Sequence, residues 1–113
     1  MRAIVLLGGE GSRLRPLTYS VPKPMLPIAG KPMVAHTIEW LGRNGVDQVI
    51  FALGYRPDAF REAFPDSSWA GVDLVYAVEP EPLDTAGAVR FAAECVGATD
   101  ERLVVCNYYC FFV

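Results

Sequence analysis

The chain alternates short apolar runs with stretches whose apolar residues have helical spacing. The runs predict buried β-strands at residues 3–7, 48–53, 73–78 and 102–106. The stretches between them predict helices from Pro32 to about Asn44, from Pro57 to about Phe64 and from about Thr85 to Val96. Because consecutive strands separated by helices need crossover connections, we expect a Rossmann-like α/β fold, with a mostly parallel sheet and flanking helices.

The helix ends and faces can also be predicted. Gly45 is expected to end the first helix as the residue after its C-cap, and Thr85 to be the N-cap of the third helix. The spacing of apolar residues in the first helix predicts a buried side made of Met33, His36, Ile38, Trp40 and Leu41.

A glycine-rich turn follows the first strand. Glycine lets the backbone adopt positive φ and approach a ligand closely, and such a turn can aim several N–H groups at one anion. Arginine and lysine side chains nearby add fixed positive charge. The turn holds Gly8, Gly9 and Gly11, and the cations that follow are Arg13, Arg15 and Lys23. A polyphosphate site is the interpretation that this combination favours; an ordinary strand-to-loop turn is the alternative.

Two other phosphate loops do not fit the turn. A dinucleotide fingerprint requires a third glycine where this chain has Leu14, and Pro16 follows soon after. A Walker loop requires Gly-Lys-Ser or Gly-Lys-Thr, and neither tripeptide occurs in the sequence. A dinucleotide-binding oxidoreductase is therefore disfavoured.

The distribution of charge favours a small anionic ligand over nucleic acid. Residues 1–33 contain five Lys or Arg against one Glu, whereas the remainder contains five against twelve acidic residues. A nucleic-acid-binding domain is usually basic over a broad surface, so we expect no nucleic-acid partner. No apolar run approaches membrane-spanning length and no signal pattern opens the chain, so we expect a cytoplasmic protein without a membrane partner. The unpaired spacing of the three cysteines and the single His36 make zinc an improbable ligand.

An ordered set of motifs runs along the chain from Met1 to about Asn107. The motifs are Leu7 to Thr18, Pro22 to Pro27, Gly30 to Pro32, Gly54 to Pro57, Glu79 to Leu83 and Thr85 to Ala88. Together they resemble the sugar-phosphate nucleotidylyltransferases, and within them the branch similar to mannose-1-phosphate guanylyltransferases.

This resemblance implies a fold and a reaction. The fold would be the N-terminal half of a GT-A-like nucleotidyltransferase domain, so that residues 1–113 form a single partial domain. The phosphate of a sugar 1-phosphate, with mannose 1-phosphate favoured, would attack the α-phosphorus of a nucleoside triphosphate, with GTP favoured. Pyrophosphate would leave, a nucleotide-sugar would form, and Mg²⁺ would be required.

The resemblance also assigns site residues. Arg13 and Lys23 correspond to the catalytic contacts with the triphosphate, because a guanidinium and an ammonium neutralise phosphate charge. A glutamate at position 79 can accept hydrogen bonds from the N1–H and amino group of guanine. The nucleotide-binding positions are Leu6, Gly8, Gly9, Gly11, Ser12, Glu79 and Pro82.

The sequence departs from the family pattern at three points that bear on whether this chain can catalyse the transfer. Asp84 stands where the family usually has glycine, and a charged side chain there is expected to crowd the nucleotide. The Asn-Gly-Asp that follows the fourth strand, whose Asp holds Mg²⁺, is here Asn107-Tyr108-Tyr109, so we assign no metal residue. Family members are also much longer. The alternative to a working transferase is therefore a non-catalytic nucleotide-binding or interaction half-domain, or an inactive truncated product. The apolar residues 108–113 further predict a homo-oligomer.

Overall fold

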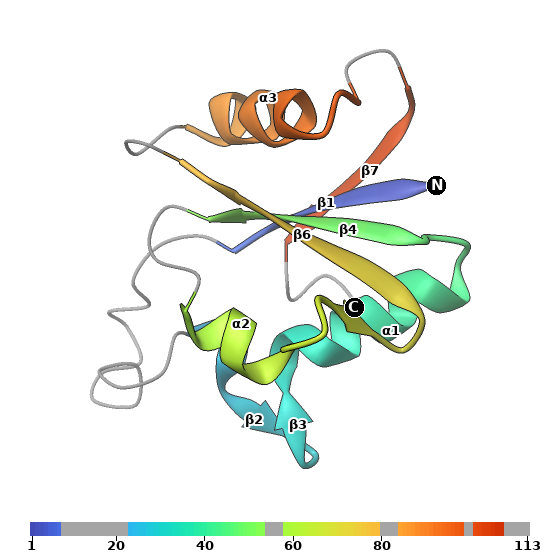
Figure 1. Ribbon diagram of the computed structural model, residues 1–113, viewed down its shortest axis with the longest axis vertical. Helices are drawn as coiled ribbons and strands as arrows, with labels where there is room; N and C mark the ends of the chain where they lie inside the picture. Colours follow the sequence, from blue (N-terminus) through green and yellow to red (C-terminus); the bar gives the residue numbers. More distant parts are fainter. Residues whose placement is uncertain (8–22, 54–57, 80–83, 99–100, 108–113) are drawn as a thin grey trace.

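The computed structural model describes residues 1–7, 23–53, 58–79, 84–98 and 101–107. Its centre is a five-stranded sheet with the order β5-β6-β4-β1-β7 (Figure 1). The four longer strands run parallel, and β5 pairs antiparallel with β6. The strands are β1 (Arg2–Leu6), β4 (Gln48–Leu53), β5 (Ser68–Trp69), β6 (Val72–Val78) and β7 (Leu103–Asn107).

Within the part of the chain that the structure describes, three α-helices cover the two faces of this sheet. They are α1 (Met33–Arg43), α2 (Asp58–Ala63) and α3 (Thr85–Cys95). Figure 1 shows α3 on one face, with α1 and α2 on the other. The prediction of a mostly parallel α/β fold with flanking helices is confirmed. Among the described helices, none is both long enough and apolar enough to cross a membrane.

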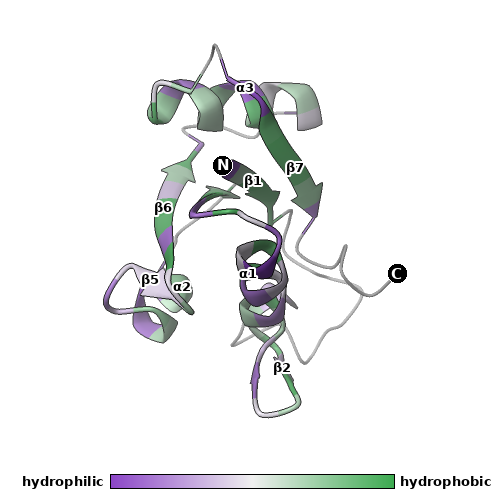
Figure 2. Cartoon of the chain, turned by 90° about the vertical axis from the view of Figure 1, so that its right-hand side faces the viewer, coloured by the Kyte–Doolittle hydropathy of each residue, from purple (hydrophilic) through white to green (hydrophobic). Residues whose placement is uncertain are grey.

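Alternation along the strands divides the core into two clusters. In β1, the fully buried Ala3 and Val5 belong to the cluster under α1 and α2, whereas Ile4 belongs to the cluster under α3. Phe51 of β4 lies at the centre of the first cluster, with its ring centroid 5.8 Å from that of Phe60 and 5.5 Å from that of Tyr76. Figure 2 shows this apolar character along β1 and β7, between the helical layers.

The strong periodic elements begin and end within about one residue of their predicted bounds. Gly45 has a φ of 93° and follows the C-cap Asn44, as predicted. Its N–H donates to the carbonyl of Gly42, and the N–H of Val46 donates to that of Leu41, which is the Schellman pattern. Pro57, where the second helix was predicted to begin, lies outside the described residues.

Two details of the helices were predicted wrongly. The N-cap of α3 is Asp84 and not Thr85, because the Asp84 Oδ1 accepts a hydrogen bond from the Gly87 N–H at 2.6 Å. Trp40 is not on the buried side of α1 and is 40% exposed. It lies about 200° around the helix from the buried Ile38, whereas Leu41 returns to the buried face.

Two small hairpins were not predicted. One joins β2 (Pro27–Ile28) to β3 (Lys31–Pro32), and the other joins β5 to β6. Each turn has alanine followed by glycine with positive φ at both residues, which are 52° and 84° in the first hairpin and 51° and 81° in the second. Positive φ at both positions is the requirement of a type I′ turn, in which asparagine or aspartate is more usual than alanine. A 3-10 helix, η2 (Lys23–Met25), precedes the first hairpin.

Candidate functional site

The carboxyl ends of the parallel strands form one edge of the sheet. Leu6, at the end of β1, is in register with Ala52 of β4 on one side and with Asn107 of β7 on the other. Next along the edge, the Glu79 N–H donates to the Leu53 carbonyl at 2.9 Å. Ligands of open parallel sheets bind outside this edge, where the strand order reverses.

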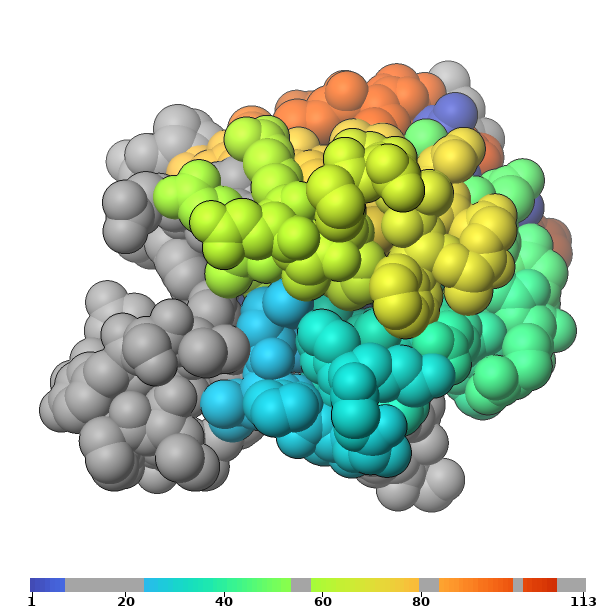
Figure 3. All heavy atoms as spheres, turned by 60° about the horizontal axis from the view of Figure 1, so that its bottom comes forward, coloured from blue at the N-terminus to red at the C-terminus, as the bar shows by residue number. Residues whose placement is uncertain are grey.

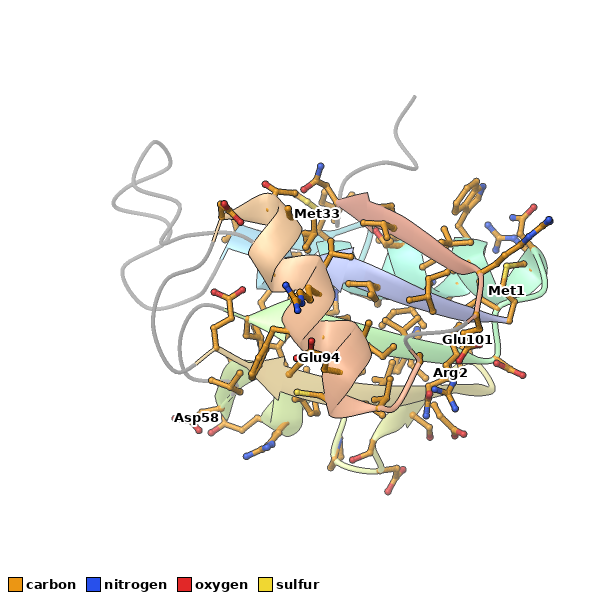
Figure 4. All side chains as sticks on the ribbon, turned by 90° about the horizontal axis from the view of Figure 1, so that it is seen from above. Met1, Arg2, Met33, Asp58, Glu94 and Glu101 are labelled. Atoms are coloured by element: carbon orange, nitrogen blue, oxygen red, sulfur yellow. The ribbon has the colours of Figure 1, made fainter. Side chains whose placement is uncertain are left out.

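The structure places two of the predicted nucleotide-binding residues on this edge. Leu6 ends β1, and Glu79 follows β6, with only β4 between these two strands. Both side chains are half-buried. The opposite edge is marked in Figure 4 by Met1, Arg2 and Glu101, which lie together at one end of the molecule. The other predicted site residues lie outside the described residues. They are Gly8, Gly9, Gly11, Ser12 and Arg13 of the glycine-rich turn, and Pro82.

Lys23 is the first residue of the 3-10 helix η2. The next two residues, Pro24 and Met25, are buried. The Leu26 carbonyl then accepts a hydrogen bond from the N–H of Met33, the first residue of α1, at 2.9 Å. The segment that begins at Lys23 is therefore fixed against the N-terminal end of α1.

The cations of the N-terminal third do not all serve the turn, which corrects the inference from charge distribution. The ammonium of Lys31 lies 2.7 Å from both carboxylate oxygens of Glu39. Arg2 lies at the opposite edge, where its Nη1 is 3.2 Å from Glu101 Oε1 and donates to the Val96 carbonyl. Of the five cations, Arg13, Arg15 and Lys23 remain as candidates for phosphate.

Glu39 also accepts a hydrogen bond from the indole N–H of Trp69 at 2.9 Å. The charged hydrogen bond from Lys31 holds the pKa of Glu39 below its usual range, although partial burial opposes this shift. Because the pKa is lower in the folded state, the carboxylate stabilises the fold at neutral pH. That contribution is lost as the pH falls through the folded value.

His36 lies beside this group and is half-buried on α1. Its Nε2 is 2.6 Å from the carbonyl oxygen of Ile28 in β2. Since a carbonyl only accepts, the proton must be on Nε2. No role for Glu39 or Trp69 was predicted from the sequence. The hydrogen bonds of Glu39 with Lys31 and Trp69 join residues whose spacing in the sequence matches neither a helix nor a strand.

Asp84 has a structural role in the described chain. Its carboxylate caps α3 and its carbonyl accepts the N–H of Ala88 at 2.8 Å. A negative charge at a helix N-terminus is favourable to the helix dipole. The capping bond explains why an aspartate is tolerated here, and its effect on a bound nucleotide stays a prediction.

The described residues do not form a magnesium site. Over residues 1–7, 23–53, 58–79, 84–98 and 101–107, no three His, Cys, Asp or Glu side chains come together in a way that could hold a metal ion. At the carboxyl edge, Glu79 and Asn107 are too few donors for the octahedral oxygen shell of Mg²⁺. We therefore assign no step to the ion.

The similarity to known proteins covers nearly the whole chain. Residues 2–109 match the family model described as nucleotidyl transferase. The chain is 41% identical over 108 residues to a mannose-1-phosphate guanyltransferase of Gibberella zeae, covering 95% of this chain and 30% of that protein. It is 45% identical over 91 residues to a mannose-1-phosphate guanylyltransferase of Mycobacterium tuberculosis, covering 80% of this chain and 25% of the relative.

Solved structures give the same result for the fold. HddC from Yersinia pseudotuberculosis, complexed with GMP-PN, superposes with a TM-score of 0.78 at 31% identity and covers 95% of this chain. A UDP-glucose pyrophosphorylase complexed with UDP-glucose superposes with a TM-score of 0.75 at 20% identity, which supports the fold alone. The chain spans 47% of the HddC chain and about a third or less of the two sequence relatives. Because residues 2–109, nearly the whole of this chain, match the family model, the chain belongs to the nucleotidyl transferase family.

Proposed function

We propose that residues 1–113 are a single partial domain that binds the nucleoside triphosphate in a sugar-1-phosphate nucleotidylyltransferase, with GTP and mannose 1-phosphate as the favoured substrates. The observation that carries the proposal is the carboxyl edge of the sheet, where Leu6 ends β1 and Glu79 follows β6, with only β4 between these strands. The similarity to guanylyltransferases over nearly the whole chain supports the same choice of substrates.

The proposed reaction transfers a nucleotidyl group. A phosphate oxygen of the sugar 1-phosphate attacks the α-phosphorus of GTP, the bond to the β-phosphate oxygen breaks, and pyrophosphate leaves. Because the nucleophile is already an anion, the protein has to position two polyanions and offset their charge. Arg13 and Lys23 supply that charge, and the backbone of Gly8, Gly9, Gly11 and Ser12 supplies N–H donors to the phosphates.

The choice of base depends on the residues around Glu79. A carboxylate only accepts hydrogen bonds, which matches the N1–H and amino group of guanine and not the acceptor edge of adenine N1. Leu6 and Pro82 are proposed to contact the same base. The structure of HddC that this chain resembles was obtained with GMP-PN, a guanine nucleotide, which supports this preference.

Isothermal titration with GTP tests the proposed site. The chain is expected to bind GTP more tightly than ATP, UTP or dTTP. Replacement of Arg13 by Ala is expected to weaken GTP binding by roughly 1.5–3 kcal/mol, the scale for a lost charged hydrogen bond.

Arg2→Met is the matched control for this titration, because it removes a cation from the opposite edge of the sheet, beside Glu101. It is expected to leave the GTP affinity unchanged. Equal affinities for the wild type and Arg13→Ala, or equal losses in Arg13→Ala and Arg2→Met, would reject the assignment of the turn.

A second candidate function is nucleotide binding without transfer. The observation that favours it is the sequence Asn107-Tyr108-Tyr109, which lacks the carboxylate that the family has at the third position. A neutral phenol is a poor ligand for a hard divalent cation. In this case the GTP titration succeeds and pyrophosphate release fails.

We also infer that the chain forms a homo-oligomer through β7. This strand is last in the sheet order, and within the described residues it pairs only with β1. Its residues Leu103 and Val104 are half-buried, and Val105 is 44% exposed. An apolar edge strand of this kind is a template for pairing with another chain.

The mass in solution tests the role of β7. Light scattering at micromolar concentration is expected to give a dimer or larger species, and Val105→Lys is expected to reduce it to a monomer. Trp40→Lys is a matched control, because Trp40 is 40% exposed but lies on α1. A monomeric wild type, or dissociation by both substitutions alike, would show that β7 is not the interface.

A further inference from the structure

The segment that follows Lys23 is tied to α1 at three successive points. The Leu26 carbonyl accepts from the Met33 N–H at 2.9 Å. Next along the chain, the Ile28 carbonyl accepts from Nε2 of His36 at 2.6 Å. Beyond the Ala-Gly turn, Lys31 binds Glu39. The three ties follow one another about one turn apart along the helix, so the hairpin β2–β3 is held against α1.

Glu39 links three elements, because from α1 it binds Lys31 of β3 and Trp69 of β5. Its two carboxylate oxygens receive the Lys31 ammonium, at 2.7 Å each, and one of them also receives the indole N–H of Trp69. The Glu39 side chain is 21% exposed and that of Lys31 is 34% exposed, so water screens the pair only in part. Figure 3 shows the hairpin and α1 packed against the segment that contains α2 and β5.

The position of Lys23 depends on this hairpin. Lys23 opens η2, which leads into β2 within two residues, and β2 is in register with β3 at Pro27–Pro32 and Ile28–Lys31. A two-stranded hairpin this short is not stable by itself. The backbone that carries Lys23 is therefore held from its C-terminal side by whatever holds the hairpin against α1.

We propose that Glu39 is a positioning residue for Lys23: by clamping Lys31 and Trp69, it fixes the hairpin on α1 and thereby the backbone from which Lys23 reaches the triphosphate. This inference rests on the proposed function, because it takes Lys23 as a phosphate contact. Glu39 lies two turns along α1 from the end that meets η2, and its action on the ligand is through Lys23.

Nucleotide affinity in combined variants tests this coupling. Glu39→Gln keeps an acceptor for the Trp69 N–H and removes the negative charge that holds Lys31. It is expected to weaken GTP binding roughly three- to tenfold, a range typical of coupled neighbours. The same substitution is expected to have no further effect in a Lys23→Ala background, and its full effect in an Arg13→Ala background.

Three controls separate positioning from a general loss of structure. Glu94→Gln removes a glutamate that is also paired with a cation, Arg90, at 3.1 Å on the exposed face of α3, and it should leave the GTP affinity unchanged. Lys31→Met breaks the clamp from the other side and should reproduce the dependence on Lys23, which keeps the test valid if Glu39→Gln does not fold. Circular dichroism at the titration temperature shows that each variant is folded.

The possible failures are distinguishable. The role of Glu39 is overturned if Glu39→Gln has the same effect on GTP affinity with and without Lys23. It is also overturned if neither Glu39→Gln nor Lys31→Met changes the affinity. Both outcomes leave the proposed function standing. If the wild type does not bind GTP, or if Lys23→Ala binds it as well as the wild type does, the phosphate site itself is wrong. The role of Glu39 in nucleotide binding is then wrong as well.

Discussion

The purified 113-residue chain is expected to release pyrophosphate from GTP and mannose 1-phosphate at only a trace rate, about a thousandfold or more below that of a full-length guanylyltransferase. Metal-based stabilisation of a phosphoryl transition state is worth several kcal/mol, and each 1.4 kcal/mol is about tenfold in rate. By the resemblance, Tyr109 stands where the family has a metal-binding aspartate. The chain also corresponds to only 47% of the HddC chain.

A coupled pyrophosphate assay with saturating Mg²⁺ measures this rate, and the Gibberella zeae relative, assayed under the same conditions, gives the reference. Replacing Tyr108-Tyr109 by Gly-Asp is expected to leave the rate at a trace, because a restored carboxylate does not supply the rest of the fold seen in HddC. Robust Mg²⁺-dependent turnover by the wild-type chain would contradict the prediction.

Phe51→Ala is expected to have the largest effect on stability, lowering the free energy of unfolding by about 3–5 kcal/mol. Phe51 is completely buried in β4, between Phe60 of α2 and Tyr76 of β6. Its removal leaves a cavity where the sheet meets α2, and the neighbouring rings cannot fill it. Small domains have only about 5–15 kcal/mol of stability in total, so the variant is expected to be partly unfolded at room temperature.

Urea denaturation followed by circular dichroism measures this change. Phe91→Ala is the matched control, since Phe91 is only half-buried on α3 and packs at the margin of the second cluster. It is expected to cost clearly less than Phe51→Ala. Similar midpoints for the two variants would mean that the Phe51 cluster does not dominate the core.

Much of the fold could be predicted because its strongest signals are periodic. The Gln48–Leu53 run is apolar on both faces of the sheet, and five of its six residues are buried, so its place in the sheet centre follows from composition alone. The parallel arrangement follows from the helices between the strands. That Leu6 and Glu79 lie at one edge is a finding of the structure, because no alternation rule specifies which side chains meet there.

The features that the sequence did not reveal depend on contacts without a period. The two alanine-glycine turns place a residue that disfavours positive φ where asparagine is usual, so their hairpins had no composition signal. The pairing of Lys31 with Glu39 depends on how the hairpin lies along α1, and the bond to Trp69 depends on the second hairpin. For this reason the charge of Lys31 was counted from the sequence with the phosphate-binding turn, whereas in the structure Lys31 is paired with Glu39.

The position of β1 between β4 and β7 has a consequence for biosynthesis. Arg2 is in register with Gln48 on one side and with Leu103 on the other, so β1 gains its second neighbour only after Leu103 has been translated. Such non-local pairing slows folding and lengthens the time for which an apolar strand edge is exposed. A nascent chain stalled before residue 103 is therefore expected to have β1 half-paired, in a form that chaperones bind and that closes when β7 emerges.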